Sequence, residues 1–287
     1  MEQRTAAVSV RNVTKRFGPV LANDKVCLDI YRGEILALLG ENGSGKTTLM
    51  NMLSGIYYPD EGEIYINGKP VSISSPKESF HLGIGMIHQH FKLVDVFTAA
   101  ENIILGLDEK LDMKSAIRKI RKICDQYGFD IDPNQKIYDM SVSQKQTIEI
   151  IKVLYRGADI LLLDEPTAGM DALSRRQMWN LLRKLNGKNL TILLTTHYME
   201  EAQNLCSRVA LMDHGKLEEV NTPAGLIDSL GNYTVDEFAG DETHSHYFHS
   251  REEAIAYLSD LSGQASLRET TLEDVFVERA GRHLMPS

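Results

Sequence analysis

The residues with the clearest chemistry form a glycine-rich run, Gly40–Thr47, with the sequence GENGSGKT. It fits the phosphate-binding pattern G-x-x-x-x-G-K-[ST], between an apolar run at Ile35–Leu39 and an expected helix at Thr48–Ser54. Glycines let backbone N–H groups curl around an anion, and a helix N-terminus adds positive potential. We expect Lys46 to reach the β- and γ-phosphates and the Thr47 hydroxyl to hold Mg²⁺. In this context the motif favours a bound nucleoside triphosphate over a plain glycine-rich turn.

Two adjacent carboxylates follow an apolar run further along the chain. Ile160–Leu163 has the composition of a buried strand, and Asp164 and Glu165 come directly after it. In open α/β sheets, ligands bind at the carboxyl ends of the strands. Asp164 is therefore placed to hold Mg²⁺, directly or through water, and Glu165 to polarise an attacking water. The alternative is a solvated Asp-Glu-Pro loop, and the phosphate loop upstream favours the functional interpretation.

Two further polar side chains lie at expected strand ends. His197 closes the run Leu194–His197 and is placed to contact the γ-phosphate, although a single histidine at a strand end is more often structural. Gln89 follows the short strand expected at Ile84–Ile87, and its amide is placed to contact Mg²⁺ and water. The role of Gln89 rests on its position alone.

The elements around these residues alternate between strands and helices, which indicates an α/β fold with a mostly parallel central sheet. Strands are expected at residues 8–13, 26–30, 35–39, 63–66, 84–87, 160–163, 190–194 and 209–212. Asn67-Gly68 after the fourth of these predicts an antiparallel hairpin. We expect one large α/β domain over 8–230, with an inserted helical subdomain at about 98–157, and a small α+β extension over 231–287.

Composition limits the classes that this chain can belong to. Its 287 residues are 43% hydrophobic and 25% charged, which is ordinary for a globular protein. The net charge of −9 argues against a chain that coats nucleic acid, so no nucleic-acid partner is expected. No apolar run approaches the ~18 residues of a membrane span, and the first residues are not those of a signal peptide. Cys27, Cys124 and Cys206 lack metal-ligand spacing and fit reduced thiols. We therefore expect a cytoplasmic chain that reaches the membrane only through a partner.

Taken in order, these motifs resemble the nucleotide-binding subunit of ATP-binding cassette (ABC) transporters over residues 8–230. The resemblance implies the phosphate-loop NTPase fold of that family, with an antiparallel β subdomain and an inserted helical subdomain. It implies ATP as substrate, Mg²⁺ as cofactor, a homodimer or heterodimer of ATPase subunits, and an integral-membrane permease that holds the chain at the inner face of the cell membrane. The matching residues are the adenine-stacking aromatic Phe17, the Walker A residues Gly40, Asn42, Gly43, Ser44, Gly45, Lys46, Thr47 and Thr48, the Q-loop residue Gln89, the Walker B residues Asp164 and Glu165, the D-loop residue Asp171, and the switch histidine His197.

One family motif departs from its usual form. The signature Leu-Ser-Gly-Gly-Gln corresponds here to Met140–Gln144, with the sequence MSVSQ, so Ser141 and Gln144 are kept and both glycines are replaced. In the family, this segment contacts the γ-phosphate bound by the other subunit. We expect Ser143 to supply its backbone N–H in that role, while Val142 adds β-branched bulk. Hydrolysis is expected to persist.

The two halves of the chain resemble different branches of the family. Residues 8–167 resemble the ATPases of simple-sugar and nucleoside importers, and residues 168–287 resemble those of drug and ABC-2-type exporters. This contrast leads to the hypothesis of a chimera joined near Asp164–Thr167, and leaves the direction of transport open. The histidines within His244–His249 favour a polar edge strand over a metal site, because no carboxylate or cysteine completes a ligand set by its spacing.

Three functions remain open at this stage. The leading one is an ATPase that powers a transporter through nucleotide-driven dimerisation. The second is a soluble ABC ATPase acting on nucleic acid or ribosomes, which the acidic charge and the single cassette disfavour. The third is a regulatory nucleotide-binding module whose altered signature gives low turnover and which has no transport partner.

Overall fold

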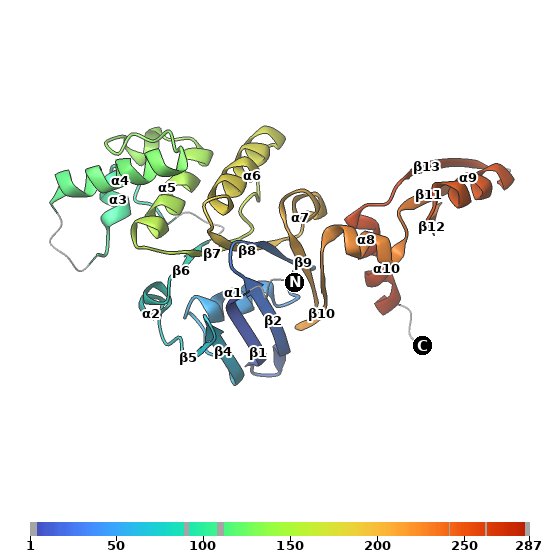
Figure 1. The fold of residues 1–287 in the computed structure, drawn as a ribbon, viewed down its shortest axis with the longest axis horizontal. Coiled ribbons are helices and arrows are strands. Elements are labelled where there is room, and N and C mark those ends of the chain that lie inside the picture. The colour runs from blue at the N-terminus through green and yellow to red at the C-terminus, as the bar shows by residue number, and fades with distance from the viewer. Residues whose placement is uncertain (1–4, 89–91, 108–111, 241, 262, 285–287) are drawn as a thin grey trace. The chain divides into compact units, whose positions relative to one another are not determined.

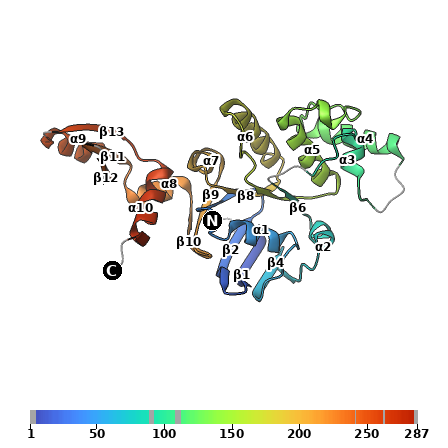
Figure 2. The same cartoon turned by 180° about the vertical axis from the view of Figure 1, so that it is seen from behind.

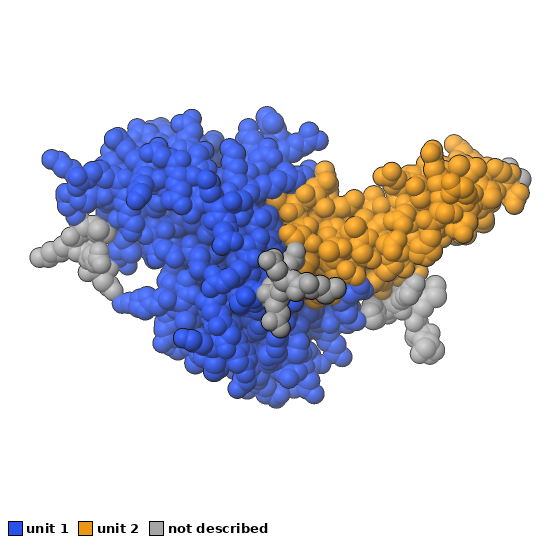
Figure 3. Space-filling model, in the orientation of Figure 1, with its two compact units in different colours: residues 1–197, 210–219 blue, residues 198–209, 220–287 orange. Residues whose placement is uncertain are grey.

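The fold was analysed in a computed structural model that describes residues 5–88, 92–107, 112–240, 242–261 and 263–284. The chain packs as two compact units, which Figure 3 distinguishes by colour. The first unit consists of Met1–His197 and Ala210–Glu219, and the second of Tyr198–Val209 and Val220–Ser287. No helix in these described ranges is long and apolar enough to cross a lipid bilayer.

The first unit is built around a six-stranded sheet with the strand order β10-β9-β3-β8-β7-β6. The strands are β3 (Ile35–Leu39), β6 (Ile84–Ile87), β7 (Ile160–Asp164), β8 (Thr191–Thr196), β9 (Arg208–Asp213) and β10 (Lys216–Asn221). Strands β3, β8, β7 and β6 run parallel to one another. Because both faces of the central strands are covered, β3 and β8 are buried along their whole length.

A second, antiparallel sheet of the first unit has the order β2-β1-β4-β5. Its strands are β1 (Ala6–Phe17), β2 (Val20–Tyr31), β4 (Glu61–Ile66) and β5 (Lys69–Val71). Asn67 and Gly68 join β4 to β5 with φ angles of 52° and 76°, and this pair of positive angles is what a type I′ hairpin turn requires. The predicted hairpin is confirmed.

Helices of the first unit surround the sheets. Helix α1 (Lys46–Leu53) follows β3, α2 (Pro76–His81) precedes β6, and α6 (Ala172–Asn186) follows β7. The inserted helical segment comprises α3 (Ala99–Ile104), α4 (Met113–Tyr127), the short 3-10 helix η1 (Ile137–Asp139) and α5 (Val142–Tyr155), and its α-helices pack on one another. In both views these helices lie beyond β6, which α2 and α5 contact (Figures 1 and 2).

The sequence predicts one apolar face of α4 from Met113, Ile117, Ile120, Cys124 and Tyr127, and the structure buries Ile120 and Cys124 while it leaves Ile117 and Tyr127 half-buried. Ala116, Ile120, Ile123 and Cys124 are buried, as a 3–4 residue repeat requires. Met113, which the same repeat places on this face, is 37% exposed because the helix begins at that residue. The buried stripe therefore starts one turn later than the sequence indicates.

The second unit combines a three-stranded antiparallel sheet with four helices. The sheet has the order β12-β11-β13, formed by β11 (Tyr233–Ala239), β12 (Glu242–Phe248) and β13 (Gln264–Glu269), and α9 (Arg251–Asp260) packs on it. Helices α7 (Met199–Leu205), α8 (Pro223–Leu230) and α10 (Leu272–Leu284) pack together. The histidine-rich strand β12 lies at the sheet edge, and the described side chains contain no cluster of His, Cys, Asp and Glu that could hold a metal.

Candidate functional site

The loop between β3 and α1 forms a cradle of backbone N–H groups. Gly43 and Gly45 have φ angles of 86° and 102°, a region that side-chain-bearing residues rarely adopt. A Cβ atom on Gly45 would lie 2.3 Å from the backbone oxygen of Ala22 in β2, so this glycine also allows a close approach of two backbones. The N-terminus of α1 follows at Lys46, which gives the loop the geometry of an anion site.

The Lys46 side chain is folded into this loop. Its Nζ atom donates to the backbone oxygens of Gly40 and Glu41, each at 2.7 Å, and the residue is buried. Burial lowers the pKa of Lys46, while the carboxylates of Glu165, Asp164 and Glu41 act in the opposite direction. The ammonium group of Lys46 therefore binds two backbone oxygens, which the oxygens of a bound phosphate would replace.

Asp164 lies at the carboxyl end of β7, where two hydroxyl groups donate to its Oδ1 atom. Thr195 Oγ1 donates at 2.6 Å and Thr47 Oγ1 at 3.3 Å. The parallel register pairs Asp164 with Thr195, so the contact follows directly from the sheet. A hydroxyl and a carboxylate that converge in this way are hard oxygen ligands of the kind that Mg²⁺ prefers. Thr47 and Asp164 thus fit the metal expected from the sequence.

Glu165 is held in an unusual backbone conformation beside them. Its φ angle is 48°, in the left-handed region that non-glycine residues seldom occupy. The backbone N–H of Glu165 donates to Thr195 Oγ1 at 3.0 Å, and its Oε1 atom lies 3.2 Å from Nδ1 of His197. The carboxylate and the imidazole can therefore share a proton or jointly orient a water.

A cavity of about 330 Å³ joins the phosphate loop to this carboxylate. Its lining residues are Val20, Leu21, Ala22, Asn42, Gly43, Gly45, Lys46, Thr47, Thr48, Glu165 and His214. Ser44 belongs to this loop, and its buried Oγ atom has no hydrogen-bond partner among the residues that the structure describes. A buried hydroxyl without a partner is uncommon, so this atom points to a ligand or water that the loop accommodates.

Phe17 lies apart from the residues that line this cavity. Its ring makes an edge-on contact with Tyr57 at a centroid distance of 5.1 Å and remains 42% exposed. Lys15 Nζ lies 5.5 Å from the centre of the ring. The cavity wall instead includes Val20, the residue that pairs with Phe17 across the β1–β2 hairpin. Adenine stacking on Phe17 stays a prediction.

The signature residues form the start of α5. Ser141 Oγ accepts from the backbone N–H of Gln144, and Gln144 Oε1 accepts from the backbone N–H of Ser141, which together make a capping box. Ser143 lies in the first turn of the same helix, and Val142 is 59% exposed. None of these residues lines the described cavity, and their contact with a γ-phosphate stays a prediction.

Of the remaining predicted residues, the structure describes Asp171, which is not part of the cavity lining. Asp171 caps α6, with its Oδ1 atom accepting from the backbone N–H groups of Leu173 and Ser174 at 2.9 Å each. These bonds, with one from the Ser174 hydroxyl, lower the pKa of Asp171. Gln89 lies outside the described residues, and its predicted contact with Mg²⁺ and water stays a prediction.

Sequence reasoning missed two residues of the site. Thr195 links the Asp164 carboxylate to the backbone N–H of Glu165 through its hydroxyl, and the polar Thr195-Thr196 pair at the end of an apolar strand was a signal for it. His214 lines the cavity from the turn after β9, and its Nδ1 atom lies 2.8 Å from Oδ1 of Asp213. No local motif marks His214, because only the packing of β9 beside β3 brings it to the phosphate loop.

Comparisons with known proteins agree with this geometry. The profile of the ABC transporter family matches residues 23–168. Over 213 residues the chain is 47% identical to the nucleoside import ATP-binding protein of Lactococcus lactis subsp. cremoris and 46% identical to the guanosine import ATP-binding protein of Bacillus subtilis. Each alignment covers 73% of this chain and 42% of the relative, so the chain spans less than half the length of either protein.

Solved structures confirm the fold that the sequence indicates. An ABC transporter cassette in its ADP conformation gives a TM-score of 0.70 at 24% identity, covering 76% of this chain and 91% of that one. A bacterial ABC transporter cassette solved as a dimer gives 0.64 at 26% identity, covering 75% and 98%. The expected fold is therefore confirmed, with a mostly parallel central sheet, an antiparallel β subdomain and inserted helices.

The relatives also bear on the hypothesis of two joined halves. The 213 residues aligned with the nucleoside import protein exceed the length of segment 8–167, so importer similarity continues past the supposed join. The chimera stays a hypothesis. Because the family profile matches just over half of the chain, the chain belongs to the ABC transporter family.

Proposed function

We propose that this chain binds and hydrolyses Mg-ATP to power transport through a separate membrane permease. The observation that supports it best is the placement of Glu165, held by Thr195 and His197, on the wall of the cavity that the phosphate loop forms. A protein that only binds the nucleotide does not require a carboxylate on the cavity wall with an imidazole beside it. The two import ATP-binding proteins that resemble the chain support the same assignment.

Each residue has a distinct part in the proposed reaction. Lys46 exchanges its two carbonyl partners for phosphate oxygens, and Glu165 orients the attacking water and accepts its proton. His197 stabilises the carboxylate and the γ-phosphate from the end of β8. Thr47 and Asp164 would hold Mg²⁺, which supplies charge neutralisation when bound.

A second ATPase subunit completes the proposed site. The N-terminus of α5 retains an anion-binding geometry even though Ser141 and Gln144 cap each other. Ser141, Ser143 and Gln144 would face the γ-phosphate of the opposite subunit, with Asp171 nearby on the D-loop. The related cassette solved as a dimer supports this arrangement, in a homodimer or a heterodimer.

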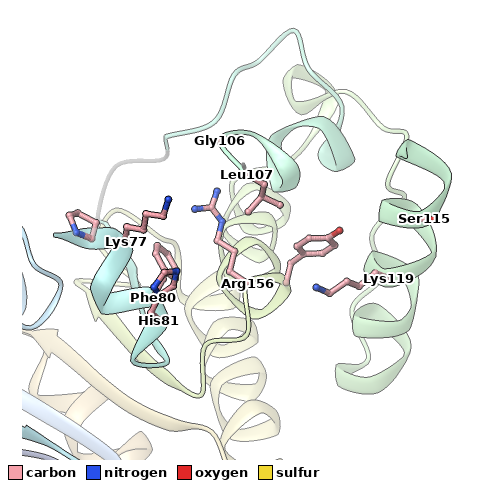
Figure 4. A pocket seen from close by; sticks show the side chains of 10 residues that line it. Lys77, Phe80, His81, Gly106, Leu107, Ser115, Lys119 and Arg156 are labelled. Atoms are coloured by element: carbon pink, nitrogen blue, oxygen red, sulfur yellow. The ribbon is translucent and has the colours of Figure 1, made fainter. Parts of the chain in front are cut away.

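The permease would bind beside the helical segment, where the first unit has a cavity of about 710 Å³ (Figure 4). The residues that line it are Pro76, Lys77, Phe80, His81, Gly106, Leu107, Ser115, Lys119, Tyr155 and Arg156. The charged side chains in this lining are those of Lys77, Lys119 and Arg156, and no carboxylate of a described residue belongs to it. The cavity therefore suits an acidic segment of a membrane partner, which would hold the chain at the inner face of the cell membrane. Import is the direction that the relatives favour.

The substitution Glu165→Gln tests the proposal. It keeps the size and the hydrogen bonding of the side chain but removes the base, so Mg-ATP should bind with unchanged affinity while turnover falls by about 10²-fold or more. The trapped nucleotide should also stabilise a dimer, measurable by sedimentation. Glu252→Gln on the exposed start of α9 is the matched control. Turnover close to that of the unmodified chain would refute the assignment, and binding without turnover in the unmodified chain would favour a regulatory module.

A further inference from the structure

One buried side chain connects the signature helix to the loop that holds Glu165. Gln146, in the second turn of α5, donates from Nε2 to the backbone oxygen of Pro166 at 2.5 Å. Gln146 is 5% exposed and Pro166 is also buried, so water does not compete for this bond. The bond links two segments 20 positions apart in the sequence, within the same compact unit.

The backbone of Glu165 needs such support. A residue that precedes proline prefers an extended conformation, yet Glu165 precedes Pro166 and has a φ angle of 48°. A backbone of this kind persists only where its surroundings fix it from more than one side. Thr195 fixes the N-terminal side by accepting from the Glu165 N–H, and Gln146 fixes the C-terminal side through the Pro166 carbonyl.

We propose that Gln146 is a positioning residue that sets the orientation of Glu165 and couples it to the signature segment. The inference rests on the proposed function, in which Glu165 activates water. Because Ser141 and Gln146 belong to one rigid helix, a phosphate bound at the start of α5 by the opposite subunit moves or fixes the Gln146 amide. The alignment of each subunit's base is thereby coupled to the contact between its signature segment and the other nucleotide.

The competing explanation is a buried amide that only stabilises the fold. A purely structural glutamine would change stability without a selective effect on the chemical step. A positioning glutamine changes kcat while the affinity for Mg-ATP stays the same, and its effect depends on the presence of the Glu165 carboxylate. These two readouts separate the explanations.

The test measures kcat and Mg-ATP affinity for Gln146→Leu in the full chain, alone and combined with Glu165→Gln. We expect kcat to fall about thirtyfold in the single variant, because a misplaced base loses only part of the 10²–10⁴-fold that a positioned base supplies, and we expect affinity to stay unchanged within about twofold. In the Glu165→Gln background the same substitution should change the residual rate by less than about twofold, because the base it positions is gone. Thr147→Val, which removes only a bond to the Ser143 carbonyl inside α5, is the matched control.

Two results would overturn the inference. One is a folded Gln146→Leu variant with kcat close to that of the unmodified chain, and the other is an equal fall in rate with and without the Glu165 carboxylate. If leucine prevents folding, Gln146→Glu removes the donor at constant size and is measured in the same way. Loss of the Glu165→Gln effect itself would instead refute the proposed function, so the two failures are distinguishable.

Discussion

Substitution of Thr195 tests whether its hydroxyl fixes the Asp164 carboxylate and the backbone of Glu165. It is fully buried, donates to Asp164 at 2.6 Å and accepts from the Glu165 N–H at 3.0 Å. Thr195→Val keeps the shape of the side chain but removes both bonds. The lost bond to a charged group is worth ~1.5–3 kcal/mol, and a buried N–H without an acceptor costs ~1–3 kcal/mol. Because both bonds belong to one network and Asp164 is only half-buried, the expected loss of stability is about 2–3 kcal/mol.

The assay is urea unfolding combined with hydrogen exchange at the Glu165 amide. Thr195→Val should lower the free energy of unfolding and increase exchange at that amide, since its acceptor is gone. Thr195→Ser retains the hydroxyl and is the control, with a loss of about 1 kcal/mol for the missing methyl group. A valine variant that is as stable as the serine variant, with the Glu165 amide still protected, would refute the reasoning.

Three further predictions concern the phosphate loop, the wall of its cavity and an ion pair of the second unit. Gly45→Ala should abolish nucleotide binding, measured by calorimetry, because its Cβ would lie 2.3 Å from a β2 carbonyl oxygen at a φ angle of 102°. The bond to Asp213 raises the pKa of His214, so ATP affinity should decrease as pH rises through that value, and His214→Gln should flatten the pH profile. Burial alone would raise the pKa of Asp236, but bonds from Arg268 and a serine lower it. Stability from this carboxylate is present above its unfolded pKa of about 3.9 and is lost as pH falls through the lower folded value, and Arg268→Met should weaken this acid dependence in urea titrations.

The fold could be predicted where local pattern and burial agree. The fully apolar run Ile35–Leu39 became β3 with the expected bounds, because a strand covered on both faces needs no polar alternation. By contrast, β1 extends over Ala6–Phe17, well beyond the expected 8–13. Its additional C-terminal residues are polar apart from Phe17, and they are held by pairing with β2, which the apolar pattern of β1 itself does not indicate.

The candidate site was predictable only in part, because some of its residues are brought together by strand register and helix packing. Local sequence identifies Lys46 and Glu165, since their chemistry depends on a loop or strand end that the sequence itself specifies. The bridging role of Thr195 depends on the register between β7 and β8, and that of Gln146 on the packing of α5 against the loop at Pro166. The loss of both glycines suggests from the sequence that the signature segment is altered. In the structure α5 still begins after Ser141, because Ser141 and Gln144 form a capping box there.

The measurement that tests the central claim most directly is phosphate release per subunit as a function of protein concentration at saturating Mg-ATP. If two subunits complete each site, turnover per subunit rises with concentration and then reaches a plateau, and Glu165→Gln abolishes it. A turnover per subunit that is constant at all concentrations, or that survives in Glu165→Gln, would contradict the account.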